Sequence, residues 1–578
     1  MPILITFLTV FIAMTFTLKA FANDLKSSIK LKGLGYPVIS ENWMISAANP
    51  YAANAGAEIL AKGGTASDAM IATQTVLGLV EPQSSGLGGG AFLIWYDAAS
   101  KNIITLDGRE TASRHATPKL FQNHAGQPIK FYDAVVGGKS VGVPGIPALM
   151  LEAHKRWGKL EWAKLFDKGI ELSESGFIVS PRLSMLVDRD KEYLLRSYST
   201  ANYFYPNGKN IESGQILKNL NYAKTLRSIA SDKGKSFYHG DIANDIVRTV
   251  QSFTDNPGLL DQLDLSSYQV KERPAVCINY RSYNVCGMGP PSSGGITVGQ
   301  ILGILEPYNL SKLGPKSANA WHLIGEASRL AFADRDRYIA DSDYEVIPTN
   351  GLLDNYYLGI RSSLINKEQA LEEILPGKPP FDTTLLLEDD ESIEMPSTSH
   401  ISIVDQYGNA LSMTTTIENS FGSKLMTKGG FLLNNELTDF SFQSHKNGIP
   451  IANRIEAGKR PRSSMAPTIL LKNSKPHLII GSPGGSRIIG YVVQAIIAYV
   501  DWGMNVQQAV SMPHIINRYG TFDLEKGTNA EIFSNELSAK GFKINLRTLN
   551  SGLHAIAITD INLEGGADPR REGIVIGK

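Results

Sequence analysis

The feature of this sequence that most constrains its fold is a pair of alternating apolar and polar runs around a short polar loop. The runs are His400–Val404 and Ala410–Thr416, and the loop between them, residues 405–409, reads DQYGN. Alternation with a period of two on both sides of a glycine-containing loop predicts a β-hairpin. With all five residues in the loop, the register continues outward until Thr398 lies opposite Thr416.

This register would bring two threonine hydroxyls together at the open end of the hairpin. Directly opposed residues in an antiparallel pair have Cβ atoms about 4.5–5.5 Å apart, whereas a bulge or a one-residue slip would separate them. A threonine pair of this kind commonly does no more than stabilise a sheet. A second interpretation is that the chain is cut before Thr398, so that this residue becomes a new N-terminus.

An N-terminal threonine carries both parts of a nucleophilic centre. Its hydroxyl is a weak nucleophile until a base removes the proton, and its free α-amine, with an ordinary pKa of about 7.7–8, is such a base. Before the cut, the same hydroxyl could attack the carbonyl of Ser397, shift the acyl group from nitrogen to oxygen, and release the amine by hydrolysis. On this interpretation Ser397–Thr398 is a self-cleavage site and Thr398 is the catalytic nucleophile.

Motifs along the chain resemble those of a known family. In the C-terminal part they are TSHISIVD, TTTIENSFGS, LLNNELTDFS, KRPRSSMAPT and GSPGGSRI, and in the N-terminal part they are EPQSSGLGGGAFLIWYD, LDGRETA and GPPSSGG. In order and spacing they resemble the γ-glutamyltranspeptidase (glutathione hydrolase) family, over nearly the whole chain after the first two dozen residues.

This resemblance implies a fold and a processing event. The fold is the α+β N-terminal-nucleophile hydrolase fold, a four-layer αββα sandwich with two antiparallel sheets between helical layers. One precursor would be cut into a large subunit, residues 23–397, and a small subunit, residues 398–578. Both subunits would stay together as one fold.

The resemblance also implies roles for individual residues. Arg109 follows a predicted strand at Asn102–Asp107 and matches the position that holds the α-carboxylate of the γ-glutamyl group, a task that suits the two-pronged guanidinium. Thr416 would orient Thr398. The other assigned residues are Glu418, Glu436 and Asp439 around the substrate's α-ammonium, Ser463 and Ser464 beside its carboxylate, and Gly484 and Gly485 as an oxyanion hole. Without the resemblance, the acids would be interpreted as solvated charges, the serines as turn residues, and the two glycines as a turn between a strand and a helix.

Two features concern the shape and charge of the pocket. Some relatives have Asn and Gln at the positions of Glu418 and Glu436, so the pocket of this chain is among the more acidic ones. The chain between Asp439 and Ser463 is shorter than in relatives that carry a lid over the site. A shorter connection favours an open pocket with room for larger acceptors or γ-linked polymers.

Composition excludes several other classes of protein. With 578 residues, of which 43% are hydrophobic, the chain can bury a large core. Its 56 basic and 56 acidic residues balance, so charge gives no indication of a nucleic-acid or anionic-membrane partner. Ten histidines and two cysteines show no spacing typical of zinc ligands. The chemistry that the resemblance implies needs neither a metal nor an organic cofactor.

The N-terminus has the pattern of a secretory signal peptide. An apolar run, Pro2–Leu18, is followed by the cleavage pattern Ala20-Phe21-Ala22. This predicts removal of residues 1–22 and export to the periplasm or the medium. An uncleaved membrane anchor is the alternative, although the run is short for a spanning helix.

Three local patterns allow more than one interpretation. GLGGGA (residues 86–91) formally fits a dinucleotide fingerprint, but a helix precedes it and a strand follows, so we predict a tight helix-to-strand connection. Cys277 and Cys286 flank a predicted turn at Arg281-Ser282, where either a disulfide or two free thiols would fit. The acidic run Glu388–Glu391 has the composition of a solvated linker.

The function implied by the resemblance is acyl transfer. Thr398 would take the γ-glutamyl group from glutathione or a related γ-glutamyl amide, and the γ-glutamyl-enzyme would pass it to water or to an amino-acid or dipeptide acceptor. An alternative within the same fold is a cephalosporin (glutaryl) acylase, whose substrates lack the α-amine. An inert homologue that only binds ligands is a third hypothesis.

Overall fold

The predicted hairpin forms the middle of a large sheet. Its strands are β10 (Ser399–Val404) and β11 (Ala410–Thr416), with Val404 opposite Ala410. The loop therefore holds residues 405–409, as the sequence predicted. The same register leads outward to Thr398 and Thr416, so neither a bulge nor a slip separates them.

The computed structural model describes residues 25–380, 386–395 and 397–578. The predicted signal peptide, residues 1–22, lies outside this part of the chain. Among the described residues, no helix combines the length and the apolar character needed to cross a membrane.

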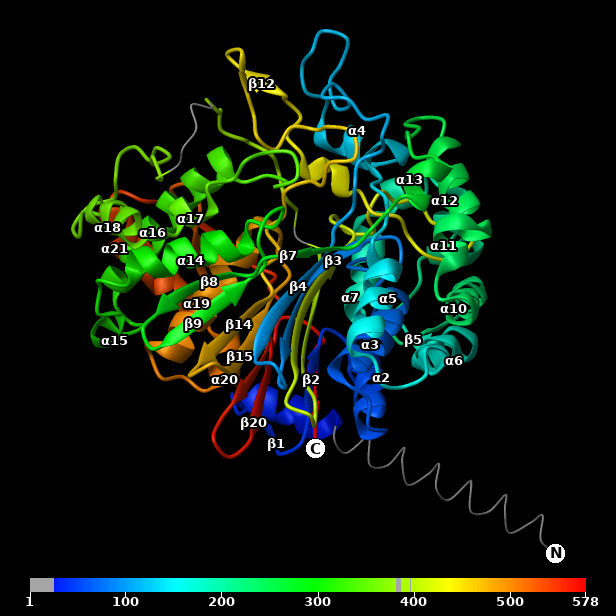
Figure 1. Cartoon of the computed structure of the whole chain (residues 1–578), viewed down its shortest axis with the longest axis horizontal. Coiled ribbons are helices and arrows are strands. Elements are labelled where there is room, and N and C mark those ends of the chain that lie inside the picture. Colours follow the sequence, from blue (N-terminus) through cyan, green and yellow to red (C-terminus); the bar gives the residue numbers. More distant parts are fainter. Residues whose placement is uncertain (1–24, 381–385, 396) are drawn as a thin grey trace, which may run out of the picture.

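Two seven-stranded antiparallel sheets stand face to face (Figure 1). In spatial order the first sheet is β21 (Ile574–Gly577), β2 (Met44–Ala47), β10, β11, β3 (Gly90–Asp97), β4 (Asn102–Gly108) and β7 (Lys271–Arg273). The second sheet is β1 (Val38–Ser40), β20 (Leu563–Ala567), β19 (His554–Ile558), β15 (Lys475–Gly481), β14 (Thr468–Lys472), β9 (Tyr283–Gly287) and β8 (Val276–Tyr280). Side chains such as Ile94, Ile479 and Ile556 form an apolar core between the two.

Helices cover the outer face of each sheet, on the right and left of Figure 1. The helices that pack into the core of the first sheet are α2 (Pro50–Ala61), α3 (Ala66–Val80), α5 (Ile146–Trp157), α6 (Asp167–Ser175), α7 (Pro181–Arg189), α8 (Lys191–Leu194), α9 (Tyr198–Phe204), α10 (Leu220–Asp232), α11 (Lys235–His239), α12 (Asp241–Gln251) and α13 (Gln262–Ser266). Those that pack into the core of the second sheet are α14 (Gly294–Leu305), α15 (Leu310–Leu313), α16 (Ala318–Tyr338), α18 (Asn355–Ser363), α19 (Ile488–Val500), α20 (Val506–Ser511) and α21 (Ser534–Ala539). This arrangement is the predicted four-layer αββα sandwich.

Shorter elements complete the fold. They are the helices α4 (Phe131–Val135) and α17 (Thr349–Leu352), the pair β5 (Phe177–Ile178) with β6 (Ile216–Leu217), the pair β12 (His445–Lys446) with β13 (Ile449–Pro450), and a small sheet of β16 (Ile515–Asn517), β17 (Thr521–Glu525) and β18 (Lys543–Arg547). The pair β12–β13 lies in the shortened connection between Asp439 and Ser463.

The polar positions of the hairpin are buried, because its second face packs against the other sheet. Every residue of β10 and β11 is buried. Ser402 donates a hydrogen bond to the carbonyl of His554 and Ser412 donates to that of Ile480, both in the second sheet. The alternation of the sequence therefore marks an apolar face toward the helices and a small polar face toward the other sheet.

The glycine run at residues 86–91 is a close-packed connection, as predicted. It joins the end of α3 to β3. A Cβ atom on Gly88 would lie 2.1 Å from the carbonyl oxygen of Leu432, and one on Gly89 would lie 2.0 Å from that of Thr416. Glycine is required here because backbone, which cannot move aside, lies against both positions.

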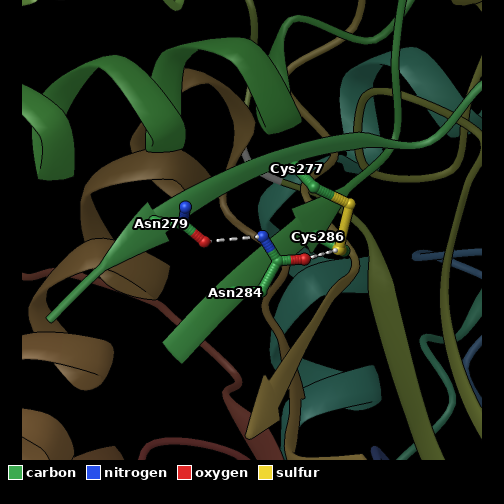
Figure 2. The surroundings of a disulfide bond; sticks show 4 residues. All are labelled: Cys277, Asn279, Asn284 and Cys286. Carbon is green, nitrogen blue, oxygen red and sulfur yellow. Dashed lines mark hydrogen bonds between the residues drawn. A yellow bond between two sulfur atoms is a disulfide. The ribbon is translucent and has the colours of Figure 1, made fainter. Parts of the chain in front are cut away.

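The two cysteines are joined by a disulfide across a hairpin (Figure 2). Cys277 in β8 lies directly opposite Cys286 in β9, at the edge of the second sheet. The neighbouring cross-strand pair is Asn279 and Asn284, whose side chains are hydrogen-bonded at 3.1 Å. Of the two interpretations of the sequence, the free-thiol one is therefore wrong.

We predict that Gly89→Ala destabilises the protein by about 1–3 kcal/mol, because the new methyl group must push Thr416 away. Thermal or urea unfolding measures this loss. Gly359→Ala is the matched control, since Gly359 is an exposed residue of α18 and no atom lies within 4 Å of the position that its new methyl group would take. The control should stabilise by about 0.5–1 kcal/mol. Equal stability of the two variants would contradict the close packing at Gly89.

Candidate active site

The bond between Ser397 and Thr398 lies at the open end of the hairpin, with two hydroxyls on its carbonyl oxygen. Thr398 Oγ1 is 2.5 Å from the carbonyl oxygen of Ser397 and 3.2 Å from Thr416 Oγ1. Thr416 Oγ1 is 2.9 Å from the same carbonyl oxygen and accepts a hydrogen bond from the N–H of Glu418. The predicted threonine pair therefore meets at the predicted cleavage site.

Each hydroxyl has one hydrogen, which limits how this triangle can be bonded. Thr398 donates to the carbonyl oxygen of Ser397 at 2.5 Å, because so short a contact between two oxygens needs a hydrogen between them. Thr416 can donate to the same oxygen, which has two lone pairs. Together the two hydroxyls polarise the carbonyl group, and Thr398 Oγ1 lies beside it.

Both sides of this bond are held by buried contacts. Ser397 Oγ donates to the carbonyl oxygen of Gln83 at 2.6 Å. On the other side, Arg571 Nη1 donates to the carbonyl oxygen of Thr398 at 2.7 Å. Both anchors come from segments distant in sequence, so the tertiary fold determines the conformation of the bond.

The predicted site residues gather around one small cavity of about 20 Å³. All of them line it except Gly484 and Ser397, which adjoin lining residues in the chain. Glu394 and Met395, just before the cleavage site, line it as well. No residue of the connection 440–462 is among the described residues that line the cavity.

Arg109 follows β4 and is held by the acids that were predicted to surround an ammonium group. It forms buried ion pairs with Glu436 and, at 2.6 Å, with Asp439. Its remaining N–H groups donate to the carbonyls of Pro461, at 3.2 Å, and Arg462, at 2.9 Å. Burial alone would lower the pKa of Arg109, but the two carboxylates outweigh it and raise the pKa, so the guanidinium stays charged.

Several carboxylates line the cavity, whereas Arg109 is the one cation among its described lining residues. Burial raises the pKa of Glu418, Glu436 and Asp439 well above the ordinary range, and repulsion between the acids adds to the effect. Glu418 is further bonded to Asn435 and, at 3.0 Å, to the N–H of Met395. An ammonium group entering this pocket would relieve the repulsion, because carboxylates are natural partners for a cation.

The serine pair lines the same cavity as Arg109 and is held by other partners. Ser464 Oγ accepts a hydrogen bond of 2.8 Å from Arg335, and Ser463 Oγ accepts one of 3.1 Å from the N–H of Met465. Arg335 in turn forms an ion pair with Glu394. In the uncut chain, neither serine is bonded to Arg109.

Gly485 packs against the segment that precedes Thr398. Gly484 and Gly485 have φ of 142° and 60°, and a Cβ on Gly485 would lie 2.8 Å from the carbonyl oxygen of Glu394. Within the described residues, no hydrogen bond uses the N–H of either glycine. Backbone conformation and space exclude side chains at Gly485, and two such N–H groups have the character of an oxyanion hole.

Several residues of the site were not identified from the sequence. They are Glu110, Arg335, Glu394 and Arg571. Glu110 lies in the motif LDGRETA, directly after Arg109, and is buried 4.0 Å from its guanidinium. The other three lie in none of the motifs, and only the pairing of distant segments identifies them.

The acidic run before the cut is partly buried, which corrects its interpretation as a solvated linker. Asp390 is 3% exposed. It forms an ion pair of 2.9 Å with Arg462 and accepts a hydrogen bond of 2.8 Å from Asn453. Composition alone missed this because the partners of Asp390 come from a segment more than sixty residues away.

The described residues contain no group of three or more His, Cys, Asp or Glu side chains arranged to hold a metal ion. Two acids of the pocket, Glu436 and Asp439, pair with Arg109. The site brings together two hydroxyls, a glycine pair and a set of opposed charges.

Two antiparallel sheets between helical layers, an αββα sandwich, are the architecture of the N-terminal-nucleophile hydrolases. A family model, gamma-glutamyltranspeptidase, matches residues 52–578. The chain belongs to the γ-glutamyltranspeptidase family.

Some relatives are named as glutathione hydrolases and others as acylases. The chain is 36% identical over 551 residues to the glutathione hydrolase proenzyme of Bacillus subtilis (strain 168), covering 93% of this chain and 92% of that protein. It is 33% identical over 546 residues to the acylase ACY 1 proenzyme of Pseudomonas sp. (strain V22), with 93% and 94% covered. The crystal structure of cephalosporin acylase from Bacillus halodurans superposes with a TM-score of 0.83 at 27% identity, covering 94% and 97%.

We predict that Glu110→Gln reduces the stability that the protein loses as pH rises from about 4 to about 8. Burial raises the pKa of Glu110 to about 8, above its value of about 4.3 in an unfolded chain. A raised pKa contributes stability below about pH 4 that is lost as pH rises through 8. The effect on the free energy of unfolding is on the order of a few kcal/mol.

Melting temperatures between pH 5 and 9 test this prediction. The parent should lose stability over this range, and Glu110→Gln should lose less. Glu536→Gln, at an exposed position of α21, is the matched control and should follow the parent. Parallel curves for parent and Glu110→Gln would show that Glu110 is ionised at neutral pH in the fold.

Proposed function

We propose that this protein cuts itself between Ser397 and Thr398 and then transfers γ-glutamyl groups. The donor is glutathione or a related γ-glutamyl amide, and the acceptor is water or the amine of an amino acid or dipeptide. The observation that carries the proposal is the placement of Thr398 and Thr416 on the carbonyl of Ser397, beside a pocket of one arginine and several acids.

The self-cleavage step follows from the hydroxyl triangle. Thr398 Oγ1 attacks the carbonyl carbon of Ser397, and the C–N bond to Thr398 breaks as the acyl group moves to oxygen. Thr416 stabilises the negative charge on the carbonyl oxygen by hydrogen bonding. Water then hydrolyses the ester, which leaves residues 23–397 and 398–578 as two subunits of one fold.

The same hydroxyl serves the second reaction, with the new α-amine as its base. Thr398 Oγ1 attacks the γ-carbonyl of the donor, and the N–H groups of Gly484 and Gly485 stabilise the oxyanion. The leaving amine takes a proton as the γ-glutamyl-threonine ester forms. Water or an acceptor amine resolves that ester.

The charges of the pocket match the amino-acid end of a γ-glutamyl group. Such a group carries one carboxylate and one ammonium. Its carboxylate can pair with Arg109 and its ammonium with Glu436 and Asp439, so that new ion pairs replace the present ones. A glutaryl group brings only a carboxylate. It would separate Arg109 from Glu436 and Asp439 and leave those acids without a cation, which is costly for buried charges.

A cephalosporin or glutaryl acylase is the second candidate, because a relative and a superposable structure carry acylase names. The acids around Arg109 favour the γ-glutamyl hypothesis. We further propose that the apolar N-terminal run directs export, and that cleavage opens a pocket able to accept large γ-linked acceptors.

We predict that Thr398→Ala abolishes both self-cleavage and turnover, because one hydroxyl performs both attacks. Thr398→Ser keeps the hydroxyl and should cut itself and turn over slowly. Denaturing gels report the cut, and release of p-nitroaniline from γ-glutamyl-p-nitroanilide reports turnover. An alanine variant that is cut and active would refute the assignment of the nucleophile.

We predict that the parent strongly prefers γ-glutamyl-p-nitroanilide to glutaryl-p-nitroanilide. One charged hydrogen bond is worth about 1.5–3 kcal/mol, or about tenfold to a hundredfold in kcat/KM. Asp439→Asn should narrow the preference by about that factor, because one acid that would bind the α-ammonium is neutralised.

Asp343→Asn is the matched control for this comparison. Asp343 also pairs with an arginine, Arg273 at 2.7 Å, but it lies outside the pocket. Its substitution should leave the preference unchanged. Equal kcat/KM for both substrates in the parent would reject the transpeptidase proposal in favour of an acylase.

A further inference from the structure

A second, larger cavity adjoins the one that holds Thr398. Its volume is about 700 Å³, within the range of about 300–1,000 Å³ that is typical of small-molecule sites. Glu394 lines both cavities, and Ser486, which lines the larger one, directly follows Gly485, which lines the smaller one. Once the segment that contains Glu394 has moved away, a molecule that reacts at Thr398 can therefore extend into the larger cavity.

Arg518, in the turn between β16 and β17, brings an incompletely balanced positive charge to the larger cavity. Its side chain is 19% exposed, and within the described part of the chain the one carboxylate that pairs with it is that of Asp523, at 3.6 Å. Asp523 also pairs with Arg487 at 2.7 Å and lies 3.9 Å from Arg547, so three guanidinium groups share one carboxylate. Burial lowers the pKa of Arg518, and the charge of Arg487 lowers it further. A further anion beside Arg518 would therefore be stabilising.

Arg518 and Ser486 have hydrogen-bond donors available for such an anion. Arg518 Nη1 donates to Ser486 Oγ, and among the described residues this is the one hydrogen bond that the side chain of Arg518 donates, although a guanidinium has five N–H groups. The hydroxyl of Ser486 accepts this bond and keeps its own hydrogen to donate. A carboxylate in the cavity can accept from both side chains, and a planar guanidinium is well suited to bind it.

The other charges of the cavity wall are largely balanced. Asp336 and Glu394 pair with Arg335, Asp389 with Arg337, Asp390 with Arg462, and Glu391 with Lys446. Arg329, the second arginine of the wall, pairs with Glu326 at 2.5 Å. Glu372 and Glu373 are exposed, so salt and solvent screen their charges. Of the two arginines that line the cavity, Arg518 is thus the one with charge available to a ligand.

The reach from the reacting centre to Arg518 matches the length of a dipeptide. Consecutive Cα atoms are about 3.8 Å apart, and a hydrogen bond adds about 3 Å. Because Gly485 and Ser486 are consecutive and Ser486 is bonded to Arg518, the guanidinium lies within roughly 10 Å of the Gly485 N–H. Two extended residues span at most about 7 Å. A dipeptide joined through its amine to the γ-carbonyl group can therefore bring its own carboxylate to Arg518.

We propose that Arg518, together with Ser486, binds the C-terminal carboxylate of the dipeptide on the leaving-group side of the scissile amide. Arg109 keeps the amino-acid end of the γ-glutamyl group. The same subsite serves the leaving dipeptide of glutathione and a dipeptide acceptor, because transfer to a dipeptide is the reverse of its release. Arg518 is then a specificity-determining residue for dipeptides with a free carboxylate. This inference rests on the proposed γ-glutamyl transfer.

The test compares leaving groups with and without the carboxylate in Arg518→Gln. The substrates are glutathione, glutathione amidated at its glycine carboxylate, and γ-glutamyl-p-nitroanilide. The parent should prefer glutathione to its amide by about tenfold to a hundredfold in kcat/KM, as for one charged hydrogen bond. In Arg518→Gln, kcat/KM for glutathione should fall by about that factor, and the values for the other two substrates should stay within about twofold of the parent. The KM of glycylglycine as acceptor should rise in parallel.

Arg518→Lys should show a smaller fall, because lysine keeps the charge but loses the planar fork. Arg547→Gln is the matched control. Arg547 shares the same carboxylate, Asp523, at 3.9 Å, but its side chain is 45% exposed and it does not line the cavity. Its substitution changes the balance of charge around Asp523 without removing a donor from the cavity, so all three values should match those of the parent.

The outcomes separate this inference from the proposed function. The ratio of kcat/KM between two substrates does not depend on the fraction of chains that are cut, which denaturing gels report. Unchanged values in Arg518→Gln, or equal falls for glutathione and its amide, would overturn the role of Arg518. So would a parent that cleaves γ-glutamyl-p-nitroanilide but does not prefer glutathione to its amide.

Failure of both Arg518 variants to cut themselves while Arg547→Gln does would also overturn it, because Arg518 would then serve maturation. A parent that is inactive on γ-glutamyl-p-nitroanilide would instead refute the proposed function.

Discussion

The structure depends on a single antiparallel register at the centre of one sheet. With Val404 opposite Ala410, the strands β10 and β11 bring Thr398 and Thr416 to the same carbonyl oxygen. A shift of one residue would turn every hairpin side chain to the other face. It would also move the polar positions out of the space between the two sheets. The packing of four layers therefore maintains the geometry of one peptide bond.

The second constraint is electrostatic. Several carboxylates and three arginines are buried in and around the pocket, where an unpaired charge is costly. Each of these arginines has a carboxylate partner: Arg109 pairs with Glu436, Arg335 with Glu394, and Arg462 with Asp390. Burial raises the pKa of Glu436 and Asp439, and repulsion from the neighbouring acids adds to the rise. A zwitterionic ligand fits this pattern better than a simple anion.

Much of this could be predicted from the sequence, for physical reasons that differ between residues. Alternation predicted the hairpin, because period-two patterning is local. The glycines at 88 and 89 marked a close approach, because only glycine leaves room for backbone at about 2 Å from a Cβ position. The family motifs identified Arg109 and the acids Glu418, Glu436 and Asp439. Composition predicted that Asp390 is solvated, and this is wrong. An acidic run carries no information about the distant Arg462, which pairs with Asp390 in the fold.

The sequence by itself determined the strands, their register, the threonine pair and the family of the chain, because these are encoded in local patterns and motif order. Only the tertiary structure decided that Cys277 and Cys286 are bonded, that Arg109 pairs with the acids, and that Arg335 faces Glu394 and Ser464. Each of these contacts joins residues whose separation depends on how strands and helices from different layers pack. Buried charges choose their partners by three-dimensional proximity, and no local pattern records that choice.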